Sequence, residues 1–382
     1  MLIDITRLLG RFLKGRLPTG VDRVSLAYIG HYAHNSQALV RWAGQCFVLS
    51  AKASERIYKY LLSPEWHNAE DIRPAMVKGI LTGRCQQKIP GRFLFNTGHS
   101  GLEQPDYPAL LKRLRVRPIF LVHDLIPITH PEYCRPGELQ RHAIRMTTAL
   151  GCAAGIITNS QSTLDILKRY ACNVGKAMPL TIPALLAPEV PKITSGPRPI
   201  ADPYFVMLGT IEPRKNHWLM LQVWRRLIER LGDNAPKLVV IGQRGWECEN
   251  VIDLLERCEQ LQRRVIERTD CPDAELVTWL HHSQALLFPS FAEGYGLPVV
   301  EALALGVPVI ASNLPVFCEI SGDIPEYIDP LDGKRWGEII EEYSLPQSPS
   351  REAQILRLGT FKAPTWKEHF ARVDEFLECL HG

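Results

Sequence analysis

The chain has 382 residues, of which 46% are hydrophobic and 22% are charged, and its formal net charge is +3. This length favours two domains, and the composition is that of a globular chain that can bury two hydrophobic cores. The small net charge gives no support to a nucleic-acid partner, because such a partner requires a clustered basic face. No apolar run approaches the roughly 18 residues that a membrane-spanning helix needs.

The ten cysteines are scattered and form no C-x-x-C pair, so a zinc site is not expected. No D-x-D triplet is present either, and no metal site is predicted. The N-terminal residues lack the apolar segment and cleavage site of a secretory signal, which predicts a cytoplasmic protein with reduced thiols.

The first 23 residues combine basic and apolar side chains in a short amphipathic pattern. The basic residues are Arg7, Arg11, Lys14, Arg16 and Arg23, and the apolar residues between them are Leu8, Leu9, Phe12, Leu13 and Leu17. Such a stretch can lie on an anionic bilayer surface. It is equally compatible with a solvated loop in which a few leucines face the core, so both interpretations remain open.

The first half of the chain alternates short apolar runs with helical patterns. A long loop, residues 7–19, is expected between the first strand and the first helix. Strands that alternate with helices in this way indicate parallel β-α-β units. The predicted strands are residues 2–6, 38–42, 47–50, 93–96, 119–123 and 155–158, and the predicted helices are residues 20–34, 51–62, 137–150 and 161–170.

Residues 187–203 contain five prolines and are predicted to be a linker, because proline lacks a backbone donor and interrupts helices. The second half then repeats the order of strand, glycine turn and helix that is typical of doubly wound folds. A further loop is expected at residues 344–349, followed by a last helix at residues 365–381. The other predicted strands are residues 204–208, 237–241, 264–268, 285–288 and 308–311, and the helices are residues 216–231, 250–259, 273–281 and 297–305.

The most informative segment is residues 288–311, where a buried strand is followed by a glycine-containing loop and a helix. Glycines allow the backbone to approach a ligand, and the N-terminus of a helix directs free N–H groups toward an anion. The segment therefore predicts a diphosphate site. Its candidate residues are Glu293, Gly294, Tyr295 and Gly296 in the loop, Leu297 at the start of the helix and Glu301 one turn further on.

A second candidate segment, residues 208–217, follows the first strand of the second half. Gly209 begins its turn, and Arg214 and Lys215 precede a helix. Arginine can hold phosphate oxygens as a fork and lysine as a point charge. If the leaving group is a nucleoside diphosphate, these cations would stabilise the charge that develops on it.

Three further candidates stand at the ends of predicted strands or at the start of a helix. His123 ends the strand at residues 119–123, Gly242 follows the strand at residues 237–241, and Gly20 begins the first long helix. His123 is a candidate active-site residue, although the sequence does not identify a general base. Gly20 could let a donor phosphate or an acceptor approach the backbone.

Segment 288–311 resembles the E-x7-E signature of the family-4 retaining glycosyltransferases. These have the GT-B architecture, an α/β fold of two Rossmann-like, doubly wound domains that face a central cleft. The resemblance implies that Glu293 contacts hydroxyls of the donor sugar and that Glu301 holds the nucleotide ribose. It also implies a diphosphate clamp of Arg214 and Lys215, with His123 close to the reacting sugar. The implied donor site comprises Gly20, Gly209, Arg214, Lys215, Gly242, Glu293, Gly294, Tyr295, Gly296, Leu297 and Glu301.

The resemblance also implies a domain organisation. Residues 1–186 would be an acceptor-binding domain, 187–203 the linker, 204–364 the nucleotide-sugar domain, and 365–382 a helix that crosses back to the first domain. No cofactor or metal is implied, because in this architecture Arg, Lys and helix dipoles neutralise the diphosphate.

The activity implied is that of a hexosyltransferase of bacterial surface-polysaccharide or O-antigen assembly. Segment 209–217 resembles mannosyltransferases that use GDP-mannose, and the acceptor would be a lipid-linked oligosaccharide at the inner face of the cell membrane. GDP-fucose, UDP-glucose, a UDP-N-acetyl sugar or a rhamnose donor remain open. A nucleotide-sugar epimerase and a non-catalytic protein of the same fold are the alternatives from other classes.

Overall fold

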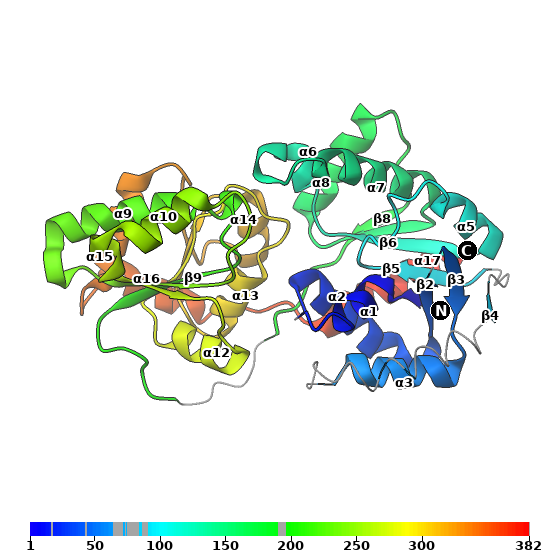
Figure 1. Ribbon diagram of the computed structural model, residues 1–382, viewed down its shortest axis with the longest axis horizontal. Coiled ribbons are helices and arrows are strands. Elements are labelled where there is room, and N and C mark those ends of the chain that lie inside the picture. Colours follow the sequence, from blue (N-terminus) through cyan, green and yellow to red (C-terminus); the bar gives the residue numbers. More distant parts are fainter. Residues whose placement is uncertain are drawn as a thin grey trace. The chain divides into compact units, whose positions relative to one another are not determined.

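A computed structural model describes residues 1–16, 18–42, 44–63, 72, 74, 84–85, 91–189 and 196–381. The chain divides into two compact units, each built on its own β-sheet (Figure 1). Unit 1 comprises Met1–Ile128, Pro136–Leu186 and Trp366–Gly382, and unit 2 comprises Thr129–Arg135 and Ala187–Thr365. Residues 190–195 of the predicted linker, Leu17 and Gly382 lie outside the described residues.

The sheet of unit 1 has eight strands in the order β4-β3-β2-β1-β5-β6-β7-β8. The pairs β2–β3 and β3–β4 are antiparallel, and all other neighbours are parallel. The direction of the strand order reverses between β1 and β5, which is where doubly wound folds bind ligands. The strands are β1 (Leu2–Asp4), β2 (Gln37–Trp42), β3 (Gln45–Val48), β4 (Arg84–Cys85), β5 (Phe93–Asn96), β6 (Arg117–Val122), β7 (Gly155–Thr158) and β8 (Thr181–Pro183).

Helices pack around this sheet, and the last helix of the chain belongs to the same unit. His369 of that helix contacts Leu185 through a hydrogen bond of 3.0 Å from Nδ1 to the backbone oxygen. A Cβ on Gly155 of β7 would lie 2.6 Å from the Phe376 ring, so the strand and the helix pack without space for a side chain. The helices are α1 (Thr6–Phe12), α2 (Gly20–Tyr32), α3 (Ala51–Leu61), α5 (Tyr107–Leu114), α6 (Ile126–Thr129), α7 (Glu138–Cys152), α8 (Gln161–Asn173) and α17 (Trp366–His381).

The prediction of a loop over residues 7–19 is wrong for its first part, because Thr6–Phe12 forms helix α1. Leu8, Leu9 and Phe12 are buried and contribute to the core. Core packing therefore accounts for three of the five apolar residues of the amphipathic pattern, and these three side chains are not available to enter a bilayer. The expectation that a few leucines face the core is confirmed for Leu8 and Leu9, although they stand on a helix and not in a loop.

The sheet of unit 2 has six parallel strands in the order β11-β10-β9-β12-β13-β14. This order, 3-2-1-4-5-6 in chain sequence, is that of the dinucleotide-binding Rossmann fold. Its strands are β9 (Tyr204–Leu208), β10 (Lys237–Ile241), β11 (Val265–Arg268), β12 (Leu286–Phe288), β13 (Val309–Ser312) and β14 (Glu326–Ile328).

Helices flank this sheet as well, and the largest core side chains, Trp224 and Trp336, come from two of them. The helices are α9 (His217–Leu231), α10 (Glu249–Arg257), α11 (Glu259–Gln262), α12 (Asp273–His281), α13 (Leu297–Ala304), α14 (Pro315–Ser321), α15 (Gly333–Ser344) and α16 (Pro349–Leu358). Two doubly wound α/β units therefore confirm the predicted fold class. No helix of the described residues combines the length and apolar character needed to cross a bilayer.

Candidate active site

The candidate site of unit 2 lies at the carboxyl ends of β9 and β12, the two strands between which the sheet order reverses. Residues 209–215 follow β9, and residues 289–296 follow β12 and lead into α13. Parallel neighbours place their carboxyl ends at the same edge of a sheet, so the two sequence motifs meet there. Ion pairs of Glu293 with Arg214 and Lys215 join the two motifs.

Two glycines let the loops after β9 and β10 lie against each other. Gly242 has φ +156°, and a Cβ there would lie 2.0 Å from the backbone oxygen of Gly209. The pairing continues beyond the strands, because Ile211 donates a backbone hydrogen bond of 2.9 Å to Gln243. Gly209 itself has φ +135°, and its Cα faces the Lys215 side chain, whose Cε would be 3.4 Å from an added Cβ. Close backbone packing therefore explains Gly242, and the positive φ explains Gly209.

Arg214 and Lys215 stand on a 3-10 turn, Pro213–Lys215, directly before α9. The next residue, Asn216, adopts the left-handed conformation with φ +59°, which asparagine tolerates better than most residues. Its side-chain amide donates a hydrogen bond of 2.8 Å to the Pro330 backbone oxygen and so anchors the turn. The turn fixes both cations at the edge of the sheet.

Glu293 joins the two motifs through its carboxylate. Its Oε2 lies 2.7 Å from Nη1 of Arg214, and its Oε1 lies 2.5 Å from Nζ of Lys215. Ser290 donates a further hydrogen bond of 2.7 Å to Oε1. The side chains of Glu293 and Lys215 are only 8% and 10% exposed, so this ion pair is almost completely desolvated. Arg214, at 22%, is the most accessible of the three.

A second carboxylate, Glu212, completes the cluster and was not among the predicted site residues. Its Oε1 lies 2.6 Å from Nε of Arg214, and its side chain is 3% exposed. Arg214 therefore bridges Glu212 and Glu293, and the cluster holds two cations and two carboxylates. The available sequence signal was its position, two residues before Arg214 in the same turn.

The electrostatics of the cluster follow from burial and from these pairs. Burial alone would raise the pKa of Glu293, but Arg214 and Lys215 outweigh it and lower the pKa to about 2. Burial lowers the pKa of Lys215 and raises that of Glu212, each opposed by its partners. The Glu293 carboxylate is therefore ionised at neutral pH. It neutralises part of the positive charge of Arg214 and Lys215.

The remaining predicted residues of segment 288–311 form the start of α13. Gly296 precedes the helix with φ +107°, and a Cβ there would lie 2.7 Å from the Phe317 ring. Leu297 is the first helical residue, and proline occupies the first turn. Gly294 is half-buried, Tyr295 is buried, and Glu301 is half-buried one turn into α13.

The other two predicted residues, Gly20 and His123, belong to unit 1. Gly20 is the exposed first residue of α2. His123 follows β6 and is buried, and its Nε2 donates a hydrogen bond of 2.7 Å to the backbone oxygen of Thr97. Burial lowers the pKa of His123, so its imidazole is neutral at neutral pH. Its ring is 5.5 Å from the ring of His99, another buried histidine.

A short segment from the first half of the sequence, Thr129–Arg135, also lies in unit 2. The Tyr133 ring stacks on Phe291 with centroids 5.3 Å apart, and the Arg135 guanidinium lies 5.0 Å from the Trp246 ring centroid. Phe291 in turn donates a backbone hydrogen bond of 2.8 Å to Arg214. Sequence reasoning missed this segment, because no local pattern shows which unit a loop packs against.

Across the described part of the chain, no group of three or more His, Cys, Asp or Glu side chains is arranged to hold a metal ion. The cations at the edge of the unit 2 sheet are side chains of the protein. Arg214 and Lys215 lie at this edge together with the residues that lead into α13.

Comparisons with known proteins relate part of the chain to glycosyltransferases. Residues 194–325 match the family described as "Glycosyl transferases group 1". The serotype-specific mannosyltransferase WbdA of Escherichia coli is 27% identical over 253 residues, which are 60% of this chain and 31% of that relative. The O-antigen chain mannosyltransferase B of Escherichia coli is 28% identical over 224 residues, which are 56% of this chain and 58% of that relative. The matches span less than two thirds of each of these relatives.

Solved structures extend the likeness to both units. Alr3699/HepE of Anabaena, solved in complex with UDP-glucose, superposes with a TM-score of 0.68 over 99% of both chains at 14% sequence identity. At that identity the likeness establishes the fold and nothing finer. The chain therefore has the GT-B fold, and its residues 194–325 match the model of the glycosyl transferases group 1 family.

Proposed function

We propose that the protein is a retaining hexosyltransferase that transfers mannose from GDP-mannose to a glycan acceptor in surface-polysaccharide or O-antigen biosynthesis. The proposal of mannose is supported by two relatives that are named as mannosyltransferases. A lipid-linked oligosaccharide is the proposed acceptor, and the reaction takes place in the cytoplasm at the inner face of the membrane.

The observation that carries the proposal is the cluster of Arg214, Lys215 and Glu293. A glycosyl donor leaves its diphosphate with a growing negative charge, and fixed cations at that point lower the barrier. Arg214 and Lys215 would stabilise this charge, and N–H groups at the start of α13 would add to it. Glu293 would then accept hydrogen bonds from sugar hydroxyls, and Glu301 would hold the ribose.

Contact with an anionic membrane surface is proposed for the exposed side chains of Lys14 and Arg16. Their charges would act without insertion of Leu8, Leu9 and Phe12, which are buried in the core. Cosedimentation with phosphatidylglycerol vesicles tests this point, and unchanged binding of a Lys14→Glu/Arg16→Glu variant would contradict it.

The transfer itself can be tested with GDP-mannose and a crude lipid-linked acceptor fraction, with and without EDTA. We expect a new glycosidic bond whose anomeric configuration, read by proton NMR, equals that of the donor. Transfer should survive the chelator. Isomerised sugar nucleotide formed without acceptor would favour the epimerase instead, and transfer from only a UDP-sugar would correct the donor.

A further inference from the structure

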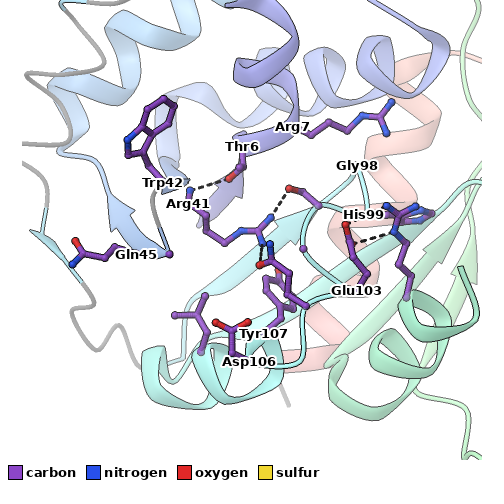
Figure 2. A pocket seen from close by; sticks show the side chains of 16 residues that line it. Thr6, Arg7, Arg41, Trp42, Gln45, Gly98, His99, Glu103, Asp106 and Tyr107 are labelled. Atoms are coloured by element: carbon purple, nitrogen blue, oxygen red, sulfur yellow. Dashed lines mark hydrogen bonds and ion pairs between the residues drawn. The ribbon is translucent and has the colours of Figure 1, made fainter. Parts of the chain in front are cut away.

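Unit 1 contains a cavity of about 400 Å³ at the carboxyl ends of β1, β2 and β5 (Figure 2). Thr6 follows β1, Trp42 ends β2, and residues 98–101 form the loop after β5. The strand order reverses between β1 and β5, so the cavity lies where a doubly wound sheet binds its ligand. Its volume is within the range of about 300–1,000 Å³ that is typical of small-molecule pockets.

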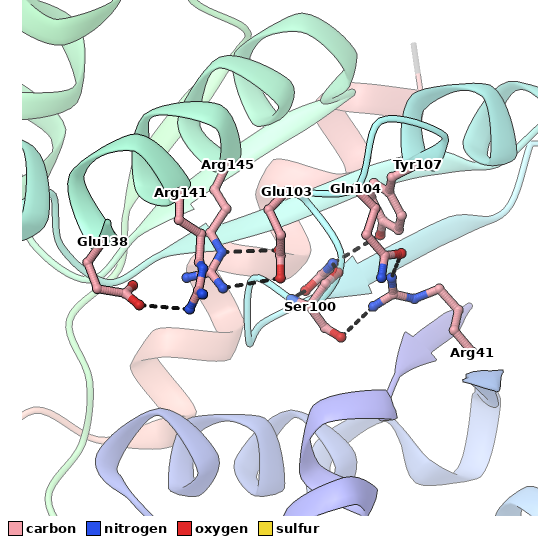
Figure 3. Close-up of polar contacts among 9 residues, drawn as sticks. Arg41, Ser100, Glu103, Gln104, Tyr107, Glu138, Arg141 and Arg145 are labelled. Carbon is pink, nitrogen blue, oxygen red and sulfur yellow. Dashed lines mark hydrogen bonds and ion pairs between the residues drawn. The ribbon is translucent and has the colours of Figure 1, made fainter. Parts of the chain in front are cut away.

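Arg41 forms one wall of this cavity and is held by several partners (Figures 2 and 3). Its Nη1 donates a hydrogen bond of 3.2 Å to Gln104, its Nη2 donates to Ser100, and its Nε lies 3.3 Å from Asp4. Its guanidinium lies 5.0 Å from the centroid of the Tyr107 ring. A side chain fixed at this many points presents a preorganised surface to a ligand.

The opposite wall carries a bidentate ion pair between Arg145 and Glu103 (Figure 3). Nε and Nη2 of Arg145 donate hydrogen bonds of 3.1 and 3.3 Å to the two carboxylate oxygens. The Glu103 carboxylate also accepts a hydrogen bond from its own backbone N–H. Arg145 has more N–H donors, and the Glu103 carboxylate more acceptor sites, than these bonds use. The pair therefore offers both donors and acceptors to a ligand, which is what a hydroxyl group requires.

The charges around the cavity balance one another. Arg41 is paired with Asp4 and Arg145 with Glu103, while Arg7 shares Asp22 with Arg11. The lining also contains the exposed carboxylate of Asp106. An anionic ligand would therefore have to break existing pairs and would meet an additional carboxylate. A neutral, hydroxyl-rich ligand meets neither obstacle.

Trp42 adds an apolar surface to this polar cavity. It is 53% exposed, which is unusual for a tryptophan, and it pairs with Gln45 across the β2–β3 hairpin. Both residues line the cavity. A pyranose ring has an apolar C–H face and a rim of hydroxyls, so an exposed indole beside amide, guanidinium and carboxylate groups matches both of its surfaces.

We propose that this cavity binds a neutral pyranose unit of the acceptor glycan, with Trp42 against its C–H face and the Arg145–Glu103 pair on its hydroxyls. The inference rests on the proposed function and adds the part of the acceptor that unit 1 recognises. An acceptor phosphate bound by the arginines is the competing possibility, and the experiment below separates the two.

The test is saturation-transfer difference NMR on the full chain with methyl α-mannopyranoside, methyl α-glucopyranoside, methyl α-rhamnopyranoside and methyl β-N-acetylglucosaminide. At least one glycoside should receive saturation, and Trp42→Ala should weaken its binding by about tenfold. Trp42→Phe keeps an aromatic face, so its affinity for the glycoside should be closer to that of the unchanged protein. Trp218→Ala is the matched control, because Trp218 is 51% exposed but belongs to unit 2, and it should bind as the unchanged protein does.

Inorganic pyrophosphate and GDP complete the experiment. Pyrophosphate affinity should be the same in Arg145→Gln as in the unchanged protein, and a loss would assign the cavity to the acceptor phosphate. No saturation of any glycoside, or equal saturation in Trp42→Ala, would overturn the inference. Trp42→Ala should keep the melting curve and the circular dichroism spectrum of the unchanged protein, which shows that the variant is folded, and it should bind GDP normally in unit 2. Failure of GDP to bind any form would count against the proposed function and leave the glycoside result standing by itself.

Discussion

Nζ of Lys215 lies 2.5 Å from Oε1 of Glu293 and 4.4 Å from the centroid of the Phe288 ring. The ammonium group is thus held by a carboxylate on one side and by an aromatic face at the end of β12 on the other. A diphosphate that uses Lys215 has to share it with Glu293 or displace the carboxylate. Because of this competition, removal of Lys215 should weaken diphosphate binding, whereas removal of the Glu293 charge should strengthen it.

Removal of the cation should weaken both binding and catalysis. We expect Lys215→Ala to lower the rate of transfer by about 100- to 1,000-fold, the usual effect of deleting one group that stabilises developing negative charge. Lys237→Ala is the matched control, since Lys237 is in the same unit and is 3.3 Å from Asp202 at the surface. A radiolabelled transfer assay measures both variants, and equal rates in them would contradict the role of Lys215.

Removal of the carboxylate should separate binding from catalysis. Glu293→Gln leaves Lys215 and Arg214 without one of their compensating charges, so GDP should bind roughly tenfold more tightly while transfer falls. The free protein should also lose stability, because a buried ion pair that loses one partner leaves an uncompensated charge. Calorimetric titration with GDP and a melting curve test these effects. Weaker GDP binding with normal transfer would refute the competition.

Much of this site was predictable from sequence, because it depends on strand ends. The bounds of β5, β7, β9, β10 and α12 agree with the predicted ranges, since each is a continuous apolar run or a clearly patterned helix between turn residues. In a doubly wound sheet the loops after such strands share one edge, so the meeting of Arg214 and Lys215 with Glu293 could be anticipated.

The features that sequence reasoning missed depend on tertiary contacts. Helix α1 was predicted as a loop because its seven residues contain a glycine and alternate basic with apolar side chains. The short strands β8 and β14 are partly exposed and have no strong apolar run. The packing of Tyr133 on Phe291 has no signature in local sequence. The only sequence signal for the pairing of Glu212 with Arg214 was the position of Glu212 two residues before Arg214.

The glycine packing between the loops after β9 and β10 predicts a large effect of one methyl group. Gly242→Ala places a Cβ 2.0 Å from the Gly209 oxygen and should destabilise unit 2 by about 1–3 kcal/mol. The control is Gly337→Ala in helix α15, where the new Cβ would lie 3.7 Å from Val223, an ordinary contact. That change should be neutral or stabilise by up to about 1 kcal/mol, because alanine is the better helix former. Denaturant unfolding compares the two, and equal stabilities would contradict the close packing.

Buried histidines in both units predict a loss of stability in mild acid. Burial lowers the pKa of His217 in unit 2 to about 3 and that of His369 in unit 1 to about 4. Below pH 6.5 these two histidines bind a proton in the unfolded chain but remain neutral in the folded chain until the pH approaches their lowered pKa values. Stability is therefore complete above pH 6.5 and falls as the pH decreases toward the folded pKa values. At pH 5 each of these histidines should cost about 2 kcal/mol.

The contact geometry of His369 supplies a variant that tests this linkage. Its Nδ1 donates to the Leu185 oxygen, so the neutral ring accepts at Nε2 from the Tyr28 hydroxyl at 2.9 Å. Protonation would remove that acceptor. His369→Gln should lower the melting temperature at pH 7.5 and flatten its dependence between pH 7.5 and 5. A melting temperature that does not fall in acid would contradict the assignment.

The central claim is that unit 2 binds a nucleoside diphosphate through Arg214 and Lys215. The most direct measurement is the thermal shift of the unchanged protein and of Lys215→Ala with GDP, UDP, dTDP and CMP. One diphosphate, GDP on the present proposal, should raise the melting temperature of the unchanged protein, since a ligand at about 100 times its Kd adds about 2.7 kcal/mol of stability. The shift should be largely lost in Lys215→Ala. No shift with any nucleotide, or the same shift in both proteins, would contradict the claim.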